Sequence, residues 1–529
     1  MIRHSLIITA FALAFCSLHV RAQEDARESY ESFRRRAAKE YSDFRAEANR
    51  RYATFLEKAW GRYKVAPGLP RPEEEEVAPV RFDRDSYRRH RDNLRREDSD
   101  GKGGKRNKIA VRRGRKGEDV IIDCPESDDD LYGDDREILI EEVIPRPDPQ
   151  PQPVPVAPVP ERDDDFQMVT VPFYGLKVGI RCPKSRLSLA SLEEKEIARG
   201  WEMLSGEAFD NTLRDLLKAR IRYQLCDWSY LLLIDSFARQ AVGAESDEAT
   251  LLMAYLFCQS GYKMRLGAGQ TRLYMLFGSR HDIYGRPYLS IGSDNYYVYS
   301  ADSPSELMAS SVAFPSETPL SLVIDREQLL GSSLSGEKRI VSSKFPEVDI
   351  KVRENRYLMD FYGTYPTSSL GDNVVSRWAM YAATPICAET RRELYPVLKK
   401  HLAGKTQKEQ VAVLLDWIQT GLVYEYDDKV WGHDRAFFAD ETLYYPYADC
   451  EDRSILLSVL VRDLVGLKCA LVYYPNHLAT AVRFTDKVAG DYLLIDGERY
   501  VITDATYIGA DVGATMPGMD NKTAKVIVL

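Results

Sequence analysis

The earliest pattern along the chain is an eleven-residue repeat of aromatic positions. Tyrosines recur every 11 residues, and phenylalanines follow with the same spacing (Tyr30, Tyr41, Tyr52, Tyr63; Phe33, Phe44, Phe55). Eleven residues over three turns is about 3.67 residues per turn, so the stripe stays on one face of a helix. The repeat predicts a long amphipathic helix over residues 23–64. Its stripe either packs on another element, or mediates self-association or docking on an envelope partner through residues 28–63.

Helical and strand periods return after residue 165. Residues 166–305 predict helices followed by strands (Leu192–Leu204, Asn211–Tyr223, Trp228–Ala241, Glu248–Ser260; strands around Tyr288–Ser300). Residues 306–385 have mostly strand patterns, for example at Pro319–Ile324 and Val348–Val352. Residues 386–529 again predict helices and then strands (Ala388–His401, Gln407–Gln419, a helix carrying Ile455, Leu456, Val459, Leu460 and Leu464; 477–484, 491–495, 499–504). This succession predicts an α+β fold.

The stretch between these regions shows neither period. It contains an acidic run, a basic run with glycines, and a segment in which proline alternates with valine or glutamine (Glu73–Glu76, Arg106–Lys116, Ile144–Pro160). Such a sequence has too little apolar surface to offset the entropy lost on ordering. We therefore predict a disordered, charged and proline-rich linker over residues 65–165.

The N-terminus has the features of a secretory signal peptide. Basic Arg3 precedes an apolar stretch from Leu6 to Leu18, and Val20-Arg21-Ala22 offers a cleavage site. Residues 1–22 are therefore predicted to be a signal peptide, and the protein to be secreted or periplasmic. A lipid-anchored form through Cys16 is disfavoured, because the preceding Phe15 is bulkier than the small residue usual there.

Length and charge limit the function classes. A chain of 529 residues is long enough for two or three domains. The net charge of −9 arises from many charges of both signs, which favours solubility and argues against a nucleic-acid partner. No Cys-x-x-Cys or His-x-x-x-His spacing occurs, so the sequence predicts neither a metal nor another cofactor.

The candidate chemistry lies near the C-terminus, where Cys450, His477 and Asp504 stand 27 residues apart. Cys450 follows Asp449, a good helix N-cap, at the start of an apolar helical pattern. Backbone N–H groups and the helix dipole favour a thiolate at such a position. His477 opens an alternating strand and Asp504 closes another. A cysteine, a base and an acid so placed predict an activated nucleophile.

Two aspartates compete for the third position. If strands 477–484, 491–495 and 499–504 formed a plain meander, His477 and Asp504 would lie at opposite ends of the sheet, and Asp496 would lie near His477. If 491–495 instead runs in the direction of 477–484, strand 499–504 becomes the antiparallel neighbour and Asp504 is the partner. The Asp-x-Thr context favours Asp504.

The middle of the chain repeats part of the C-terminal pattern without its chemistry. An apolar helix runs into Gly261-Tyr262-Lys263 as another runs into Gly466-Leu467-Lys468, and paired strands follow each. Counting back from the shared glycine places Glu245 opposite Cys450, and Ala301 falls opposite Asp504. We hypothesise a degenerate second copy at residues 166–305; convergent patterning is the alternative.

Residues Glu393 to Tyr507 resemble the transglutaminase-like superfamily, a papain-like fold with bacterial exported members. The resemblance rests on an ordered set of segments: Lys405-Thr406-Gln407-Lys408, Leu415-Asp416-Trp417-Ile418, Asp449-Cys450-Glu451-Asp452, Asn476-His477 and Asp504-Ala505-Thr506. It implies a Cys450–His477–Asp504 triad in a domain spanning residues 386–529. Leu478 and Ala479 stand where an aromatic residue often follows the histidine, and Ala505 stands where proline is frequent. These departures put the substrate preference in doubt.

The resemblance implies a thiol enzyme. Cys450 would attack the carbonyl of a peptide or protein amide, form an acyl-enzyme and release it to water or an amine. Hydrolysis is favoured over cross-linking, because the sequence has no run of calcium ligands. The alternative is a non-catalytic envelope or secreted adaptor whose triad is vestigial.

Overall fold

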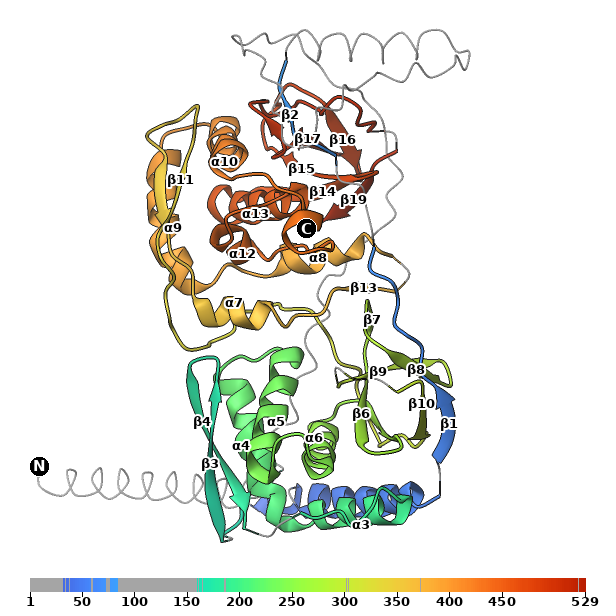
Figure 1. Cartoon of the computed structure of the whole chain (residues 1–529). Helices are drawn as coiled ribbons and strands as arrows, with labels where there is room; N and C mark the ends of the chain where they lie inside the picture. The colour runs from blue at the N-terminus through green and yellow to red at the C-terminus, as the bar shows by residue number, and fades with distance from the viewer. Residues whose placement is uncertain are drawn as a thin grey trace, which may run out of the picture.

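A computed structural model describes residues 32–83 and 159–529, apart from residues 34, 38, 59, 73–76, 160, 164, 185–186, 301, 303, 372 and 522. The predicted signal peptide and residues 84–158 of the predicted linker lie outside the described residues. The protein is of the α+β class, with helices packed on mainly antiparallel sheets (Figure 1).

The N-terminal helix covers residues 39–56 and packs beside α3 (Glu194–Leu204) (Figure 1). Its tyrosine row faces inward: Tyr52 is 2% exposed and its ring centroid lies 4.7 Å from that of Trp201. The phenylalanine row does not pack: Phe33, Phe44 and Phe55 are all more than half exposed. The predicted end of the helix at residue 64 is wrong, because Trp60–Lys64 forms strand β1.

The predicted helices of the first half are confirmed as α3, α4 (Asp210–Arg222), α5 (Asp227–Val242) and α6 (Asp247–Gln259). Ser246 begins α6 by accepting a hydrogen bond from Ala249 N at 3.1 Å, as an N-cap serine does. A β3–β4 hairpin precedes these helices (Phe166–Phe173, Leu176–Pro183). Five strands follow them and form a six-stranded sheet with β1 (β5 Met264–Ala268, β6 Leu273–Gly278, β8 Tyr288–Ile291, β9 Asp294–Val298, β10 Glu306–Ser310).

The prediction of mostly strand over residues 306–385 is wrong. Short strands do occur there (β11 Lys338–Val341, β12 Asp349–Val352, β13 Ser368–Leu370), but α7 (Arg356–Tyr362) and α8 (Ser376–Ala383) lie between and after them. The apolar run at residues 319–324 makes only an isolated bridge, Ser279 to Leu320. Its side chains are buried, and a short apolar run does not by itself distinguish a strand from other buried backbone.

The second half is again a set of helices followed by a sheet. The helices are α9 (Ala388–Leu402), α10 (Gln407–Gly421), α12 (Ala439–Tyr444) and α13 (Cys450–Leu460). The sheet has the order β16-β17-β15-β14-β19 (Tyr492–Ile495, Glu498–Thr503, His477–Arg483, Lys468–Tyr474, Lys525–Val528). Both β16 and β15 are antiparallel to β17, so the first two run in the same direction.

The two sheets have corresponding strand orders. After α6, the strands lie in the order β10-β5-β6-β9-β8; after α13, they lie in the order β19-β14-β15-β17-β16. Every neighbouring pair in both series is antiparallel. The first sheet differs by the additional edge strand β1, which pairs with β10.

Residues 60–83 connect the two halves, so the prediction that the linker begins at residue 65 is wrong. β1 extends the first sheet, Ala66 and Leu69 make bridges with Tyr288 and Tyr284, and β2 (Val80–Arg81) pairs in parallel with β18 (Tyr507–Ile508). One hydrophobic core continues from the first helices through α7 and α8 to Cys450. Within the described ranges, no helix combines the length and apolar character needed to cross a bilayer.

Candidate active site

Cys450 is the first residue of α13, as its N-cap predicts. Asp449 Oδ1 accepts from Asp452 N at 3.3 Å, and Asp452 Oδ2 accepts from Asp449 N at 3.4 Å, which closes a reciprocal cap. Arg453 fixes this helix start to the end of α10, because its buried guanidinium donates to the carbonyl oxygens of Ala448, Gln419 and Leu422. The position of the thiol is therefore set by backbone contacts on both sides.

His477 opens β15 and is oriented by Asp504. His477 Nε2 lies 2.9 Å from Asp504 Oδ2, and both side chains are essentially inaccessible to solvent. Asp504 Oδ1 accepts from the backbone N–H groups of Thr506 and Tyr507 at 2.8 and 3.2 Å. An ionised carboxylate only accepts hydrogen bonds, so the proton of the neutral imidazole resides on Nε2. Nδ1 then carries the lone pair.

The helix and the strand meet where Cys450 and His477 lie. Ser454, one turn into α13, donates to Leu478 O at 2.9 Å, and Thr480 donates to Ser454 O at 3.1 Å. As a result Cys450 and His477 line one small cavity of about 20 Å³, room for about one water molecule. His477 Nδ1 is buried and has no hydrogen-bond partner in the described part of the chain.

The two candidate aspartates lie in different surroundings. Because β16 and β15 run in the same direction, Asp504 lies at the His477 end of the sheet, as one of the two sequence alternatives required. Asp496 occupies the exposed β16–β17 turn, where its φ of 51° is left-handed. The structure therefore brings Asp504, and not Asp496, to the imidazole.

The charge state of Cys450 differs from the thiolate expected at a helix start. The residue is 3% exposed, and burial raises the pKa of its thiol well above the ordinary value, with further increases from the charges of Glu451 and Asp449. A backbone hydrogen bond from Leu478 acts in the opposite direction but is outweighed. The thiol donates to Glu451 Oε2 at 3.1 Å. Cys450 is thus held as a thiol rather than a thiolate.

A second carboxyl group shares this environment. Burial and the neighbouring Glu451 raise the pKa of Asp434 to about 7, although Arg377 acts to lower it. Arg377 Nη2 lies 3.2 Å from Asp434 Oδ2. Near neutral pH, Asp434 therefore retains a proton beside Glu451 in a substantial fraction of molecules.

Helix α8 covers the cavity. It contributes Arg377 and Trp378, both 2% exposed, to the wall opposite Cys450 and His477. The guanidinium carbon of Arg377 lies 3.8 Å from the Trp378 ring centroid, and Trp378 also packs on Tyr473 with centroids 5.2 Å apart. Helix α8 therefore packs on α13, and its Trp378 forms part of the wall around Cys450.

A larger cavity is lined in part by the residues that precede Cys450 in the sequence. It has a volume of about 240 Å³ and is lined by Trp431, Tyr445 and the 446–448 segment that leads to Asp449. Among the aromatic residues of this part of the chain, Trp431 and Tyr445 line this cavity, whereas Phe437 and Phe438 are buried. Asp427 lines it too, and lies within a few ångströms of Asp434 and Glu451.

The sequence offered no signal for several residues that position the site. Gln419 at the end of α10 donates to the carbonyl oxygens of Asp504 and Tyr507, both at 2.8 Å, and so holds the loop after β17. Arg377, Trp378 and Asp434 come from segments without a recognisable motif. Each reaches the cavity only through the tertiary fold.

Comparison with known proteins assigns no family to this geometry. The chain matches no protein-family model and no curated protein. Function therefore has to be inferred from the site itself.

Proposed function

We propose that the protein is an exported thiol enzyme that transfers acyl groups from peptide-like amides through Cys450, preferably to water. The observation that carries the proposal is the His477–Asp504 pair at 2.9 Å: its imidazole lines the same cavity as Cys450, and its buried Nδ1 has no hydrogen-bond partner among the described residues. An imidazole held in one tautomer by a buried carboxylate, beside a cysteine at a helix start, fits a nucleophile and its general base.

The high pKa of Cys450 favours proton transfer during the attack over a resting ion pair. In the proposed first step the thiol turns from Glu451 to His477, and Nδ1 takes its proton as sulfur attacks the amide carbonyl. Asp504 stabilises the resulting imidazolium. His477 then returns the proton to the leaving amine, which leaves a thioester on Cys450. Water, deprotonated by His477, hydrolyses the thioester and restores the thiol.

The cavity lined by Trp431 and Tyr445 is the proposed site for the substrate side chain. It is mainly apolar and large enough for one side chain, and Ala448, one of its lining residues, stands two positions before Cys450. Because α8 covers the sulfur, productive binding requires Trp378 to move.

We further propose that the C-terminal half is a transglutaminase-like domain and that residues 166–305 are its degenerate copy. The corresponding strand orders of the two sheets support this duplication. When α6 and α13 are aligned by their first residues, Asp247 corresponds to Cys450, whereas counting back from the shared glycine gave Glu245. The π-helical turn η2 (Val461–Val465), which follows α13, accounts for this difference of two residues. When the two sheets are aligned by the registers of β6–β9 and β15–β17, Tyr299 corresponds to Asp504, whereas counting along the sequence gave Ala301. The copy thus lacks a nucleophile and an acid.

One observation favours a second candidate, a non-catalytic adaptor. Cys450 is nearly inaccessible, donates to Glu451 and lies beneath α8. A vestigial thiol would remain in this state permanently.

The two candidates differ in the reactivity of Cys450. We expect an uncharged alkylating probe to modify Cys450, located by mass spectrometry, at a rate that falls at least about tenfold in His477→Ala, because the general base is lost. Buried Cys469, which pairs with Val482 at the opposite end of β15 from His477, is the internal control. A Cys450 that reacts no faster than Cys469, or whose rate His477→Ala leaves unchanged, would exclude the enzyme and leave the adaptor.

A further inference from the structure

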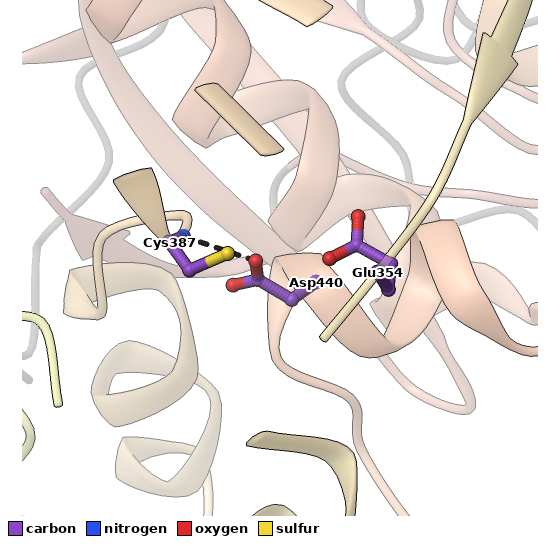
Figure 2. Close-up of side chains that lie close together, drawn as sticks. All are labelled: Glu354, Cys387 and Asp440. Atoms are coloured by element: carbon purple, nitrogen blue, oxygen red, sulfur yellow. Dashed lines mark hydrogen bonds between the residues drawn. The ribbon is translucent and has the colours of Figure 1, made fainter. Parts of the chain in front are cut away.

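A second group of acidic side chains is buried between α9 and α12, outside the cavity of Cys450. It consists of Glu354, Cys387 and Asp440, each no more than 6% exposed (Figure 2). Glu354 follows β12, Cys387 is the N-cap of α9, and Asp440 lies in the first turn of α12. One donor atom from each of the three lies within 4.8 Å of the others.

Each carboxylate in this group is anchored by one oxygen and leaves the other free. Glu354 Oε2 accepts from Thr390 Oγ1 at 2.6 Å, and Asp440 Oδ1 accepts from Cys387 N at 3.0 Å (Figure 2). The remaining oxygens, Glu354 Oε1 and Asp440 Oδ2, are buried and receive no hydrogen bond from the described part of the chain. Thr390 also contacts Cys387 Sγ at 3.2 Å. Ligands oriented by second contacts, with one donor atom left over, are typical of metal sites.

The ammonium group of Lys338, which lies near this group, donates its hydrogen bonds to other partners. Lys338, whose charge acts on Glu354, donates its ammonium group to the carbonyl oxygens of Thr442 and Tyr445. Among the carboxylates around Cys450, Asp434 differs, because Arg377 pairs with it. Buried carboxylates without a paired cation are costly unless they are protonated or bind a metal.

We propose that Glu354, Cys387 and Asp440 bind one divalent cation of the zinc class. A thiolate with two carboxylate oxygens is a borderline donor set that suits zinc better than calcium or magnesium. The ligand atoms of a tetrahedral zinc ion lie about 3.3–3.8 Å apart, within the span of this group. A water molecule would complete the coordination. The ion would tie the end of β12 to the starts of α9 and α12, independently of the chemistry at Cys450.

The protonation of the metal-free group is consistent with this assignment. Burial raises the pKa of the Cys387 thiol above its ordinary range, and the charges of Asp440 and Glu354 raise it further. The pKa of Glu354 is likewise raised by burial and by the charge of Asp440. Binding of the cation would displace these protons to solvent.

The test is cobalt binding to the full-length protein after treatment with a chelator, followed in the near ultraviolet. We expect about one cobalt ion per chain and a thiolate-to-cobalt charge-transfer band, and competition by zinc should remove the band. Cys387→Ser should abolish the band, and Glu354→Gln and Asp440→Asn should weaken binding at least about tenfold. Cys469→Ser, another buried cysteine, should leave both unchanged, and circular dichroism establishes that each variant is folded.

Three results would overturn the proposal. The first is unmodified protein that binds no stoichiometric cobalt, which requires no variant to fold. The second is a band that survives Cys387→Ser. The third is binding lost in Glu451→Gln but kept in Cys387→Ser, which would place the metal beside Cys450. In each case, protonation of Glu354 and Asp440, rather than a bound metal, would explain how the two carboxyl groups are buried together.

Discussion

At the scale of single residues, the orientation of His477 depends on one carboxylate. Asp504 is itself fixed by two backbone N–H groups, so it cannot turn away without losing them. Asp496 lies in an exposed turn and has no such role. The two aspartates are therefore a matched pair for testing the third position of the site.

We predict that Asp504→Asn lowers the probe reactivity of Cys450 by at least about tenfold, whereas Asp496→Asn leaves it within about twofold. Asparagine can donate to Nε2 and so favours the wrong tautomer, with the proton on Nδ1. The measurement is the alkylation rate of Cys450 in the two variants at equal pH. Equal rates in both would mean that Asp504 does not orient the base.

The positions of these residues could be predicted from the sequence, but their electrostatics could not. Cys450, His477 and Asp504 each lie at the end of a strongly patterned helix or strand, and such ends are visible in a sequence. The raised pKa of the thiol depends on burial beneath Trp378 and on the placement of Glu451. The burial depends on the tertiary packing of α8, a helix that the sequence pattern failed to predict, on α13.

At the scale of elements, α8 controls access to Cys450. Trp378 lines the cavity of the nucleophile and packs on Tyr473, and Arg377 holds the helix against Asp434. This short helix thus lines the cavity together with α13 and β15. Its displacement would uncover the thiol without breaking the pairing of β15 with β14 and β17.

We predict that Trp378→Ala raises the alkylation rate of Cys450 about tenfold or more, because a packed indole is replaced by open space. Thermal stability should fall at the same time, since truncating a buried tryptophan costs about 3–5 kcal/mol. Trp431→Ala is the matched control: it removes a tryptophan from the other cavity and should leave the rate unchanged. If both variants react like the unmodified protein, α8 is not the barrier.

The sheets show why topology was harder to predict than the elements themselves. The strands at 477–484, 491–495 and 499–504 were recognisable from alternation, but their order required the direction of β16, which local sequence does not encode. The metal ligands proposed here were invisible for a related reason. Glu354, Cys387 and Asp440 come from three separate elements, and no short spacing motif connects them.

At the scale of the whole molecule, buried carboxyl groups connect stability to pH. The pKa of Asp434 is about 7 in the folded protein and about 3.8 as its ordinary value. Between these values the folded state binds a proton that the unfolded state has released. Stability therefore falls as pH rises through this window, by up to about 1.4 kcal/mol per pH unit for one proton.

We predict that the Tm decreases between pH 5 and pH 7.5, and that Asp434→Asn makes the decrease shallower. The charged groups beside Asp434 are Glu451 from α13, Arg377 from α8 and Asp427 from α11 (Asp427–Val430), and all three remain in the variant. The measurement is the Tm across this range in metal-free buffer, with Asp496→Asn as the exposed control. A Tm that rises over the range, or an unchanged slope in Asp434→Asn, would contradict the assigned protonation.

The pairing of β1 with β10 and of β2 with β18 has a consequence for the folding of the chain. Trp60 pairs with Ser310, and Val80 pairs with Tyr507, so an early segment completes both halves of the fold. Closing loops of this length is entropically slow. We expect β1 and β2 to emerge from the ribosome long before their partners β10 and β18 are made, and so to remain unpaired and open to misassembly with other chains. Synthesis of the residues around Tyr507, rather than completion of either half alone, would then set the moment at which folding can finish.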